Sequence, residues 1–165
     1  MQKLSAIFNR PEYVHTIINR LPLDGLAVAT IVLLLGILIR RRTATLIGMA
    51  LVAVLSFSIW PVYHYGEEGY DRVLSMSDDA GSDFLNQHKE LAEKYAFIYF
   101  ICGGVAAIGF AAGCKWPRSL LWTSLLTVVL SSASLATGIK IAQLGGEVRH
   151  REFRFSPPPA HQQTP

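Results

Sequence analysis

Cysteine is scarce in this chain of 165 residues, which has only Cys102 and Cys114. Both lie in one predicted helix, about 18 Å apart along its axis, which is too far for a disulfide between them. The sequence therefore lacks a disulfide framework and a cysteine-based metal motif. It also lacks an HExxH pattern, which disfavours the commonest zinc hydrolase site, and it shows no internal repeat.

Charged side chains are almost absent from four apolar runs, at residues 21–39, 44–63, 95–114 and 119–139. Each run is close to the roughly 20 residues that a helix needs to cross about 30 Å of hydrocarbon. The apolar fraction of the chain is 51%, and a soluble protein of this size would have to bury four helices that are apolar on every side. No small-residue cleavage site follows the first run, so we expect it to stay in the protein.

These runs predict an all-α fold, a polytopic membrane four-helix bundle with up-down-up-down topology in the lipid bilayer. We divide the chain into an N-terminal segment (1–12), a membrane domain (13–154) with an outer loop (64–94), and a proline-rich tail (155–165). The tail should be disordered and its His161 inert. In the outer loop, spacings of three and four predict short amphipathic helices at the interface, separated by the polar stretch 75–82.

Small residues of the third run, such as Gly103 and Ala106, predict close helix packing. Hydroxyl groups of the fourth run can bond to their own helix or to a neighbour. They belong to Ser131, Ser132, Ser134 and Thr137.

The charges of the loops predict the orientation. The basic turns 40–42 and 115–118 contain no acid, whereas loop 64–94 is mainly acidic. Because short cytoplasmic loops are rich in Lys and Arg, we expect both turns to be cytoplasmic and the loop and both termini to be extracytoplasmic. The net charge of +3 gives no reason to expect nucleic acid as a partner.

With this topology four histidines flank the spans on one face of the membrane, namely His15, His64, His88 and His150. Imidazole suits iron, copper, zinc and haem. Two neutral imidazoles from facing helices would hold a b-type haem in an apolar slot, whereas three or four ligands in contact would hold Zn, Cu or Fe. The spacing in the sequence does not choose between these sites.

Other side chains near the same face have expected roles. Pro61 should mark the end of the second span. Aromatic residues that could line a haem slot are Trp60, Tyr63, Tyr65, Tyr95 and Phe97. Glu67 and Glu90 could support a metal or activate water. We expect Asp71, Asp78, Asp79 and Asp83 to be solvated loop charges.

Four short patterns carry a resemblance to a known family. They are His15-x3-Asn19-x2-Pro22-x2-Gly25, Pro61-x-Tyr63-x2-Gly66-Glu67, His88-x-Glu90-x-Ala92 and Gly145-Gly146-x-Val148-Arg149-His150-x-Glu152. With them the chain resembles a family of bacterial four-helix membrane proteins close to, or part of, the DUF2231 group, over residues 13–154. The resemblance implies the four-span fold in a bacterial inner membrane. It favours as site residues His15, Glu67, His88, Arg149 and His150. His64 departs from the family pattern, so we keep it only as an extra metal ligand.

We therefore expect an extracytoplasmic His/Glu/Arg cluster that binds haem b for electron transfer. Two of His15, His88 and His150 would be the ligands, and Arg149 would neutralise a haem propionate. The electron partner would be a quinone, a redox protein or a larger membrane complex.

Two alternatives stay open, so the sequence does not decide whether the protein is an enzyme. In a metal-dependent membrane hydrolase, the same three histidines would hold the metal, and Glu67 or Glu90 would activate water. In a non-catalytic subunit, the cluster would pin helix ends or dock a partner.

Overall fold

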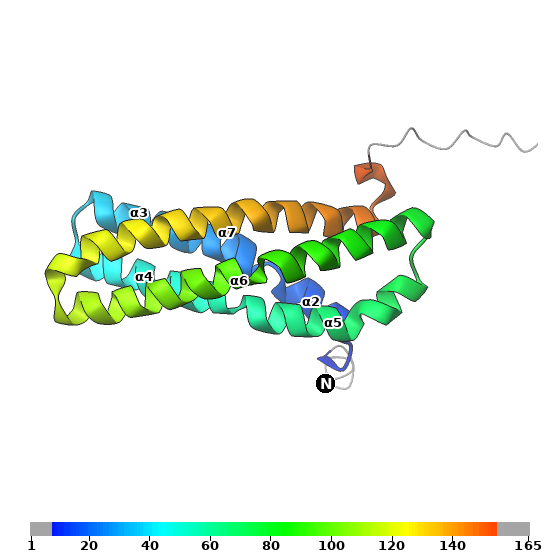
Figure 1. Ribbon diagram of the computed structural model, residues 1–165, viewed down its shortest axis with the longest axis horizontal. Coiled ribbons are helices and arrows are strands. Elements are labelled where there is room, and N and C mark those ends of the chain that lie inside the picture. The colour runs from blue at the N-terminus through cyan, green and yellow to red at the C-terminus, as the bar shows by residue number, and fades with distance from the viewer. Residues whose placement is uncertain (1–7, 155–165) are drawn as a thin grey trace, which may run out of the picture.

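The computed structural model of the protein describes residues 8–154, so the predicted tail with His161 and most of the N-terminal segment lie outside the described residues. Its helical elements are α2 (Pro11–Ile18), the π-helical η1 (Leu21–Gly25), α3 (Leu26–Leu38), α4 (Arg42–Phe57), α5 (Ile59–Ser75), α6 (Asp79–Lys115), the short η2 (Pro117–Ser119), α7 (Leu120–Arg149) and η3 (Arg151–Phe153). Short connections place successive long helices side by side and antiparallel (Figure 1).

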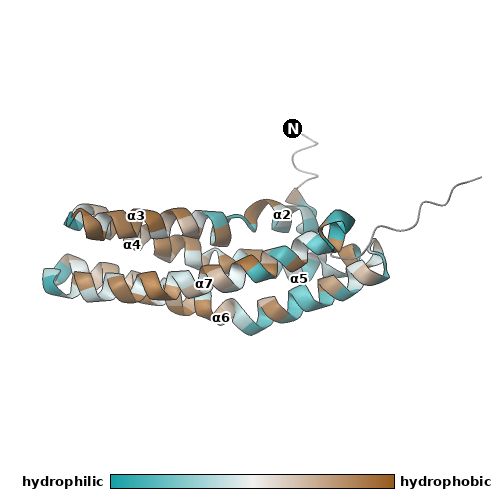
Figure 2. Cartoon of the chain, turned by 90° about the horizontal axis from the view of Figure 1, so that it is seen from above, coloured by the Kyte–Doolittle hydropathy of each residue, from teal (hydrophilic) through white to brown (hydrophobic). Residues whose placement is uncertain are grey.

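Four helical stretches are long and apolar enough to cross a membrane, namely Pro11–Leu38, Arg42–Ser75, Asp79–Lys115 and Pro117–Arg149. This confirms the predicted all-α bundle, and the chain is an integral membrane protein that crosses the bilayer several times. The 37 residues of α6 span about 55 Å, well over the roughly 30 Å of hydrocarbon, so the helices continue past the bilayer. Figure 2 shows polar residues gathering along α5 and the start of α6. We call residues 8–20, 64–94 and 140–154 the polar end.

Buried positions on α6 and α7, most of them with small side chains, recur at alternating spacings of three and four, as in a coiled coil. On α6 the buried positions include Tyr99, Cys102, Ala106, Gly109 and Gly113, and on α7 they include Ser124, Thr127, Ser131, Ser134 and Gly138. The two hydroxyls at Ser131 and Ser134 bond to carbonyls of their own helix, at Val128 and Leu130. Of the two predicted uses of these hydroxyls, the structure therefore shows the bond within one helix.

The first two spans approach each other closely at Gly48. A Cβ added at Gly48 would lie 2.5 Å from Cα of Leu33 on α3. Because that neighbour is backbone, it has no rotamer by which to move away. Glycine at this position therefore allows α3 and α4 to pack.

Two helix irregularities come from local chemistry. Pro22 has no N–H group, and the helix passes it through the π-helical η1, in which Gly25 N–H bonds to Arg20 O. The second span is interrupted at Ser58, and Pro61 lies in the first turn of α5, where a missing N–H costs little. The expected helix end at Pro61 is therefore wrong, since α5 continues to Ser75.

The outer loop also differs from its prediction. Instead of short helices lying at the interface, α5 runs on to Ser75 and α6 begins at Asp79, so that only residues 76–78 connect them. The polar stretch 75–82 does contain the break. The residues with amphipathic spacing lie on the parts of α5 and α6 that extend beyond the apolar runs. These extensions carry residues of the candidate site described below.

Candidate functional site

Two of the predicted histidines face each other at the polar end. His15 lies on α2 and His88 on α6. Their ring centres are 6.3 Å apart, and the ring planes are almost perpendicular at 85°. Both side chains are partly buried between helices.

The imidazole of His15 rests on α5. Its Nδ1 lies 2.8 Å from the carbonyl oxygen of Val62. A Cβ added at Gly66, one turn later, would lie 3.0 Å from both Cε1 and Nδ1 of the ring. Glycine at position 66 therefore leaves room for the imidazole to lie against the helix backbone.

His88 repeats this arrangement on α7. Its Nδ1 lies 2.8 Å from the carbonyl oxygen of Ile141. A Cβ added at Gly145, again four residues after the carbonyl, would lie 3.2 Å from Cε1 and Nδ1. Each histidine thus has one carbonyl partner and one glycine beneath its ring.

The carbonyl partners determine which nitrogen of each neutral ring carries the proton. A carbonyl oxygen only accepts hydrogen bonds, so in a neutral imidazole each Nδ1 carries the proton and donates it. The lone pair of each Nε2 is then free. Metal-bound histidines commonly use such a hydrogen bond from the second ring nitrogen, which orients the ring and raises its basicity.

Side-chain and backbone contacts hold the eight-residue helix α2 in place. The guanidinium of Arg72 pairs with Glu12 at 2.9 Å, and the Glu12 side chain is only 14% exposed. A Cβ added at Gly69 would lie 2.8 Å from the backbone nitrogen of Glu12. These contacts between α2 and α5 position His15.

The other two histidines of the predicted site lie at the surface with local partners. His64 is stacked on Trp60, with ring centres 6.0 Å apart, and lies 3.4 Å from Glu68. The Nδ1 of His150 lies 3.0 Å from Glu152, and its ring stacks on Phe153. The structure therefore brings His15 and His88 together and places His64 and His150 elsewhere.

The predicted carboxylates do not complete a metal site either. Glu67 accepts a hydrogen bond of 3.1 Å from Tyr63, and Glu90 is exposed. Within residues 8–154 no group of three His, Cys, Asp or Glu side chains is arranged to hold a metal ion. Two of the predicted slot aromatics, Trp60 and Phe97, are 64% and 56% exposed, so they point away from the bundle.

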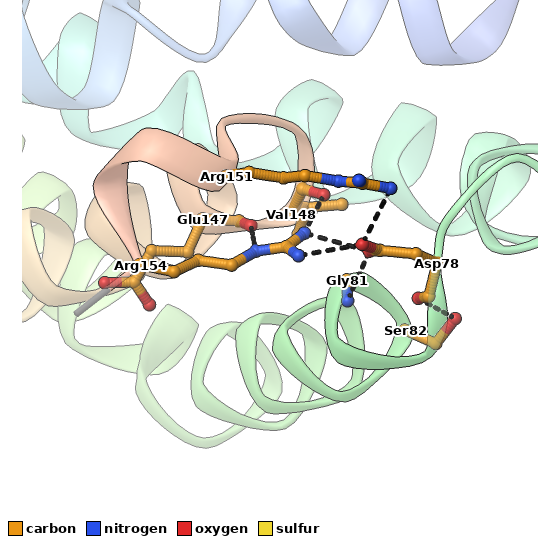
Figure 3. A network of polar contacts seen from close by, with 7 residues as sticks. All are labelled: Asp78, Gly81, Ser82, Glu147, Val148, Arg151 and Arg154. Carbon is orange, nitrogen blue, oxygen red and sulfur yellow. Dashed lines mark hydrogen bonds and ion pairs between the residues drawn. The ribbon is translucent and has the colours of Figure 1, made fainter. Parts of the chain in front are cut away.

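A second polar cluster ties the end of α7 to the start of α6 (Figure 3). Both Nη atoms of Arg154 lie 3.0 Å from the carboxylate of Asp78, and Arg151 lies 3.1 Å from it. Asp78 also caps α6 by accepting a hydrogen bond from Gly81 N–H. The expectation that Asp78 is a solvated loop charge is therefore wrong.

These contacts shift the pKa values of the charged groups in the cluster. The hydrogen bonds from Arg154, and then that from the Gly81 backbone, lower the pKa of Asp78 to about 2. Hydrogen bonding to Asp78 in turn raises the pKa of Arg154. At neutral pH the pair is fully ionised.

Sequence reasoning missed several members of these two clusters. Val62 and Ile141 act through backbone carbonyls, which side-chain identity does not reveal. Gly66 and Gly145 belong to the motifs noted above, but their contact with histidine rings depends on helix rotation. For Asp78 a signal was present, because Asp followed three residues later by Gly81 in a polar break fits a helix N-cap.

No protein-family model, no curated protein and no solved structure matches the chain. The resemblance to the DUF2231 group stays a prediction.

Proposed function

We propose that this membrane protein binds a b-type haem between His15 and His88 and serves in electron transfer. The observation that carries the proposal is the pairing of two imidazoles from facing helices, each with its Nδ1 on a backbone carbonyl. Such a pair is the ligand set of a six-coordinate haem.

The spacing of the rings supports this assignment. Two imidazoles bound to one metal ion at about 2 Å would have ring centres roughly 6 Å apart. The ring centres of His15 and His88 are 6.3 Å apart. Their separation therefore matches the one that a shared metal ion would need.

The residues of the chain have separate tasks in this proposal. His15 and His88 hold the group, Val62 and Ile141 orient the rings, and Gly66 and Gly145 give the rings room. A haem bound there would supply reversible one-electron transfer. Partial burial beside the bilayer excludes part of the water and helps to set the reduction potential.

The donor set favours haem over the hydrolase alternative. A catalytic zinc site needs three protein ligands and an open position. Of the described residues, the site offers two imidazoles, and Glu67 and Glu90 are engaged or exposed elsewhere. The pair alone therefore satisfies a porphyrin iron better than a zinc ion.

We also infer that the polar end faces the extracytoplasmic side. The basic residues of turns 40–42 and 115–118 lie at the opposite end of the bundle, and short basic turns stay in the cytoplasm. A Met76→Cys variant that also carries Cys102→Ser and Cys114→Ser tests this orientation. A membrane-impermeant thiol reagent should label it in intact cells. Labelling only after the membrane is opened would contradict the orientation.

Visible spectroscopy tests the haem directly. Protein purified in detergent from haem-supplied cells should show a Soret band and reduced α and β bands, with iron near one per chain by elemental analysis. His15→Ala and His88→Ala should each lose most of the haem while remaining in the membrane. His64→Ala and His150→Ala are matched controls and should keep it.

Other outcomes lead to the alternatives. Stoichiometric zinc without a Soret band would favour the hydrolase. Protein with neither group, whose stability falls in His15→Ala and His88→Ala, would leave the pair as a pin between helices in a structural subunit.

A further inference from the structure

A cavity of about 150 Å³ opens between the α5–α6 connection and the end of α7. Its lining is polar, and three of its residues are arginines. The lining residues are Met76, Ser77, Asp78, Val148, Arg149, Arg151 and Arg154. Figure 3 shows Arg154 and Arg151 converging on Asp78 from the C-terminal segment.

Arg154 is already fully engaged by the protein. Its Nε donates to Glu147 O at 2.7 Å, and its Nη2 donates to Val148 O at 2.9 Å. Both Nη atoms bond to Asp78, and the side chain is only 7% exposed. Arg154 therefore balances Asp78 and has little capacity left for a ligand.

The charges of the other two arginines, Arg149 and Arg151, are not neutralised by a carboxylate in this way. Arg151 makes one contact with Asp78 and is 75% exposed. Within residues 8–154, no carboxylate lies within ion-pair distance of Arg149. The cavity thus carries two guanidinium groups in excess of its carboxylate.

We propose that this cavity binds an oxyanion, a phosphate or carboxylate group, through Arg149 and Arg151. Guanidinium groups suit such anions because their N–H donors match two oxygens at once. A water molecule takes about 30 Å³, so the cavity holds a group the size of phosphate, and it is smaller than the roughly 300 Å³ of sites for larger ligands.

The oxyanion has two sources. It is a free small anion, or it is a propionate of haem bound at His88, in which case the inference rests on the proposed function. Arg149 lies one helical turn beyond Gly145, on the side of α7 that meets His88. In either case Arg149 and Arg151 would bind the anion.

Isothermal titration with inorganic phosphate, at constant ionic strength against chloride, distinguishes the sources in the purified full-length protein. For a free anion, phosphate binds saturably, and Arg149→Gln or Arg151→Gln weakens binding by about tenfold, as loss of a charge-assisted hydrogen bond predicts. Arg118→Gln, at the opposite end of the bundle, is the matched control and should change nothing.

For a propionate, phosphate does not bind, but both variants retain less haem than the wild type and Arg118→Gln does not. If phosphate binding and haem content are the same in wild type, Arg149→Gln and Arg151→Gln, the oxyanion site is overturned. A haem spectrum unchanged in these variants leaves the His15–His88 assignment standing, so the two proposals fail separately.

Discussion

The apolar part of the bundle and its polar end are held together by different interactions. In the apolar part, small side chains pack at close range, and the hydroxyls of Ser131 and Ser134 bond within their own helix. At the polar end, side chains bond from one element to another. Within the described residues, all ion pairs between separate elements lie there, at Arg72–Glu12, Arg151–Asp78 and Arg154–Asp78.

This difference follows from the solvent that each part meets. Lipid tails are as apolar as leucine, so helices in the bilayer associate through shape and close packing. Such packing is not directional, so one helix can shift slightly along another. The hydrogen bonds and ion pairs at the polar end are directional and fix the helix positions. Two imidazoles from different helices need fixed positions to face each other.

Added side chains beneath the two histidine rings should have the largest functional effect. Gly66→Val or Gly145→Val puts methyl groups where the Cβ alone would lie 3.0 or 3.2 Å from the ring. We expect most of the Soret absorbance to be lost while the protein stays in the membrane. Gly104→Val is the control, because a Cβ at Gly104 meets nothing within 4 Å. Equal haem content in all three variants would contradict the role of these glycines.

Overpacking of the apolar part should lower the stability of the folded protein. Gly48→Ala places a Cβ 2.5 Å from the backbone of Leu33, and overpacking of this kind costs about 1–3 kcal/mol. Thermal unfolding in detergent should show a clear loss for Gly48→Ala. The haem spectrum of the surviving folded protein should be unchanged. An unchanged melting temperature would mean that α3 and α4 are less tightly packed.

The Asp78–Arg154 pair should make the polar end sensitive to acid. The pKa of Asp78 is about 2 in the folded protein against 3.8 ordinarily, so the pair stabilises above pH 3.8 and is lost as the pH falls through 2. Asp78→Asn should lower the melting temperature at pH 7, by less than Gly48→Ala. Its stability should also fall less than that of the wild type between pH 4 and pH 2. Parallel pH profiles would contradict this assignment.

Removal of a hydroxyl from the apolar part should have the smallest effect. Ser131 bonds to Val128 O on its own helix, so Ser131→Ala removes a hydrogen bond within one helix. We expect a change in unfolding free energy within about 0.6 kcal/mol. A much larger loss in unfolding assays would indicate that the hydroxyl also joins two helices.

The fold was largely predictable because hydropathy and length alone specify membrane-spanning helices. The charges of the basic turns and the acidic connection predict the orientation in the membrane, which stays a prediction. What the sequence did not reveal was how far α5 and α6 extend past the bilayer. Hydropathy falls at residue 64, but the helical hydrogen bonds continue to Ser75, because helix formation does not require lipid.

The candidate site was predictable only as a set of residues. His15, His88 and His150 each follow or precede an apolar span, and side-chain identity gives no preference among them. The choice depends on the rotation of α2, which precedes the π-helical segment at Pro22, and on Gly66 and Gly145, which leave room for the two rings. His150 is excluded from the pair by the end of α7, where its chain turns to Glu152.

The spin state of the ferric protein is the sharpest test of haem binding by His15 and His88. Two neutral imidazoles on one iron would give a six-coordinate, low-spin haem, which visible and electron paramagnetic resonance spectra identify. We expect a low-spin wild type, a loss of that signal in His15→Ala and in His88→Ala, and its retention in His150→Ala. A low-spin haem that survives in the His15→Ala/His88→Ala double variant would contradict the proposed site.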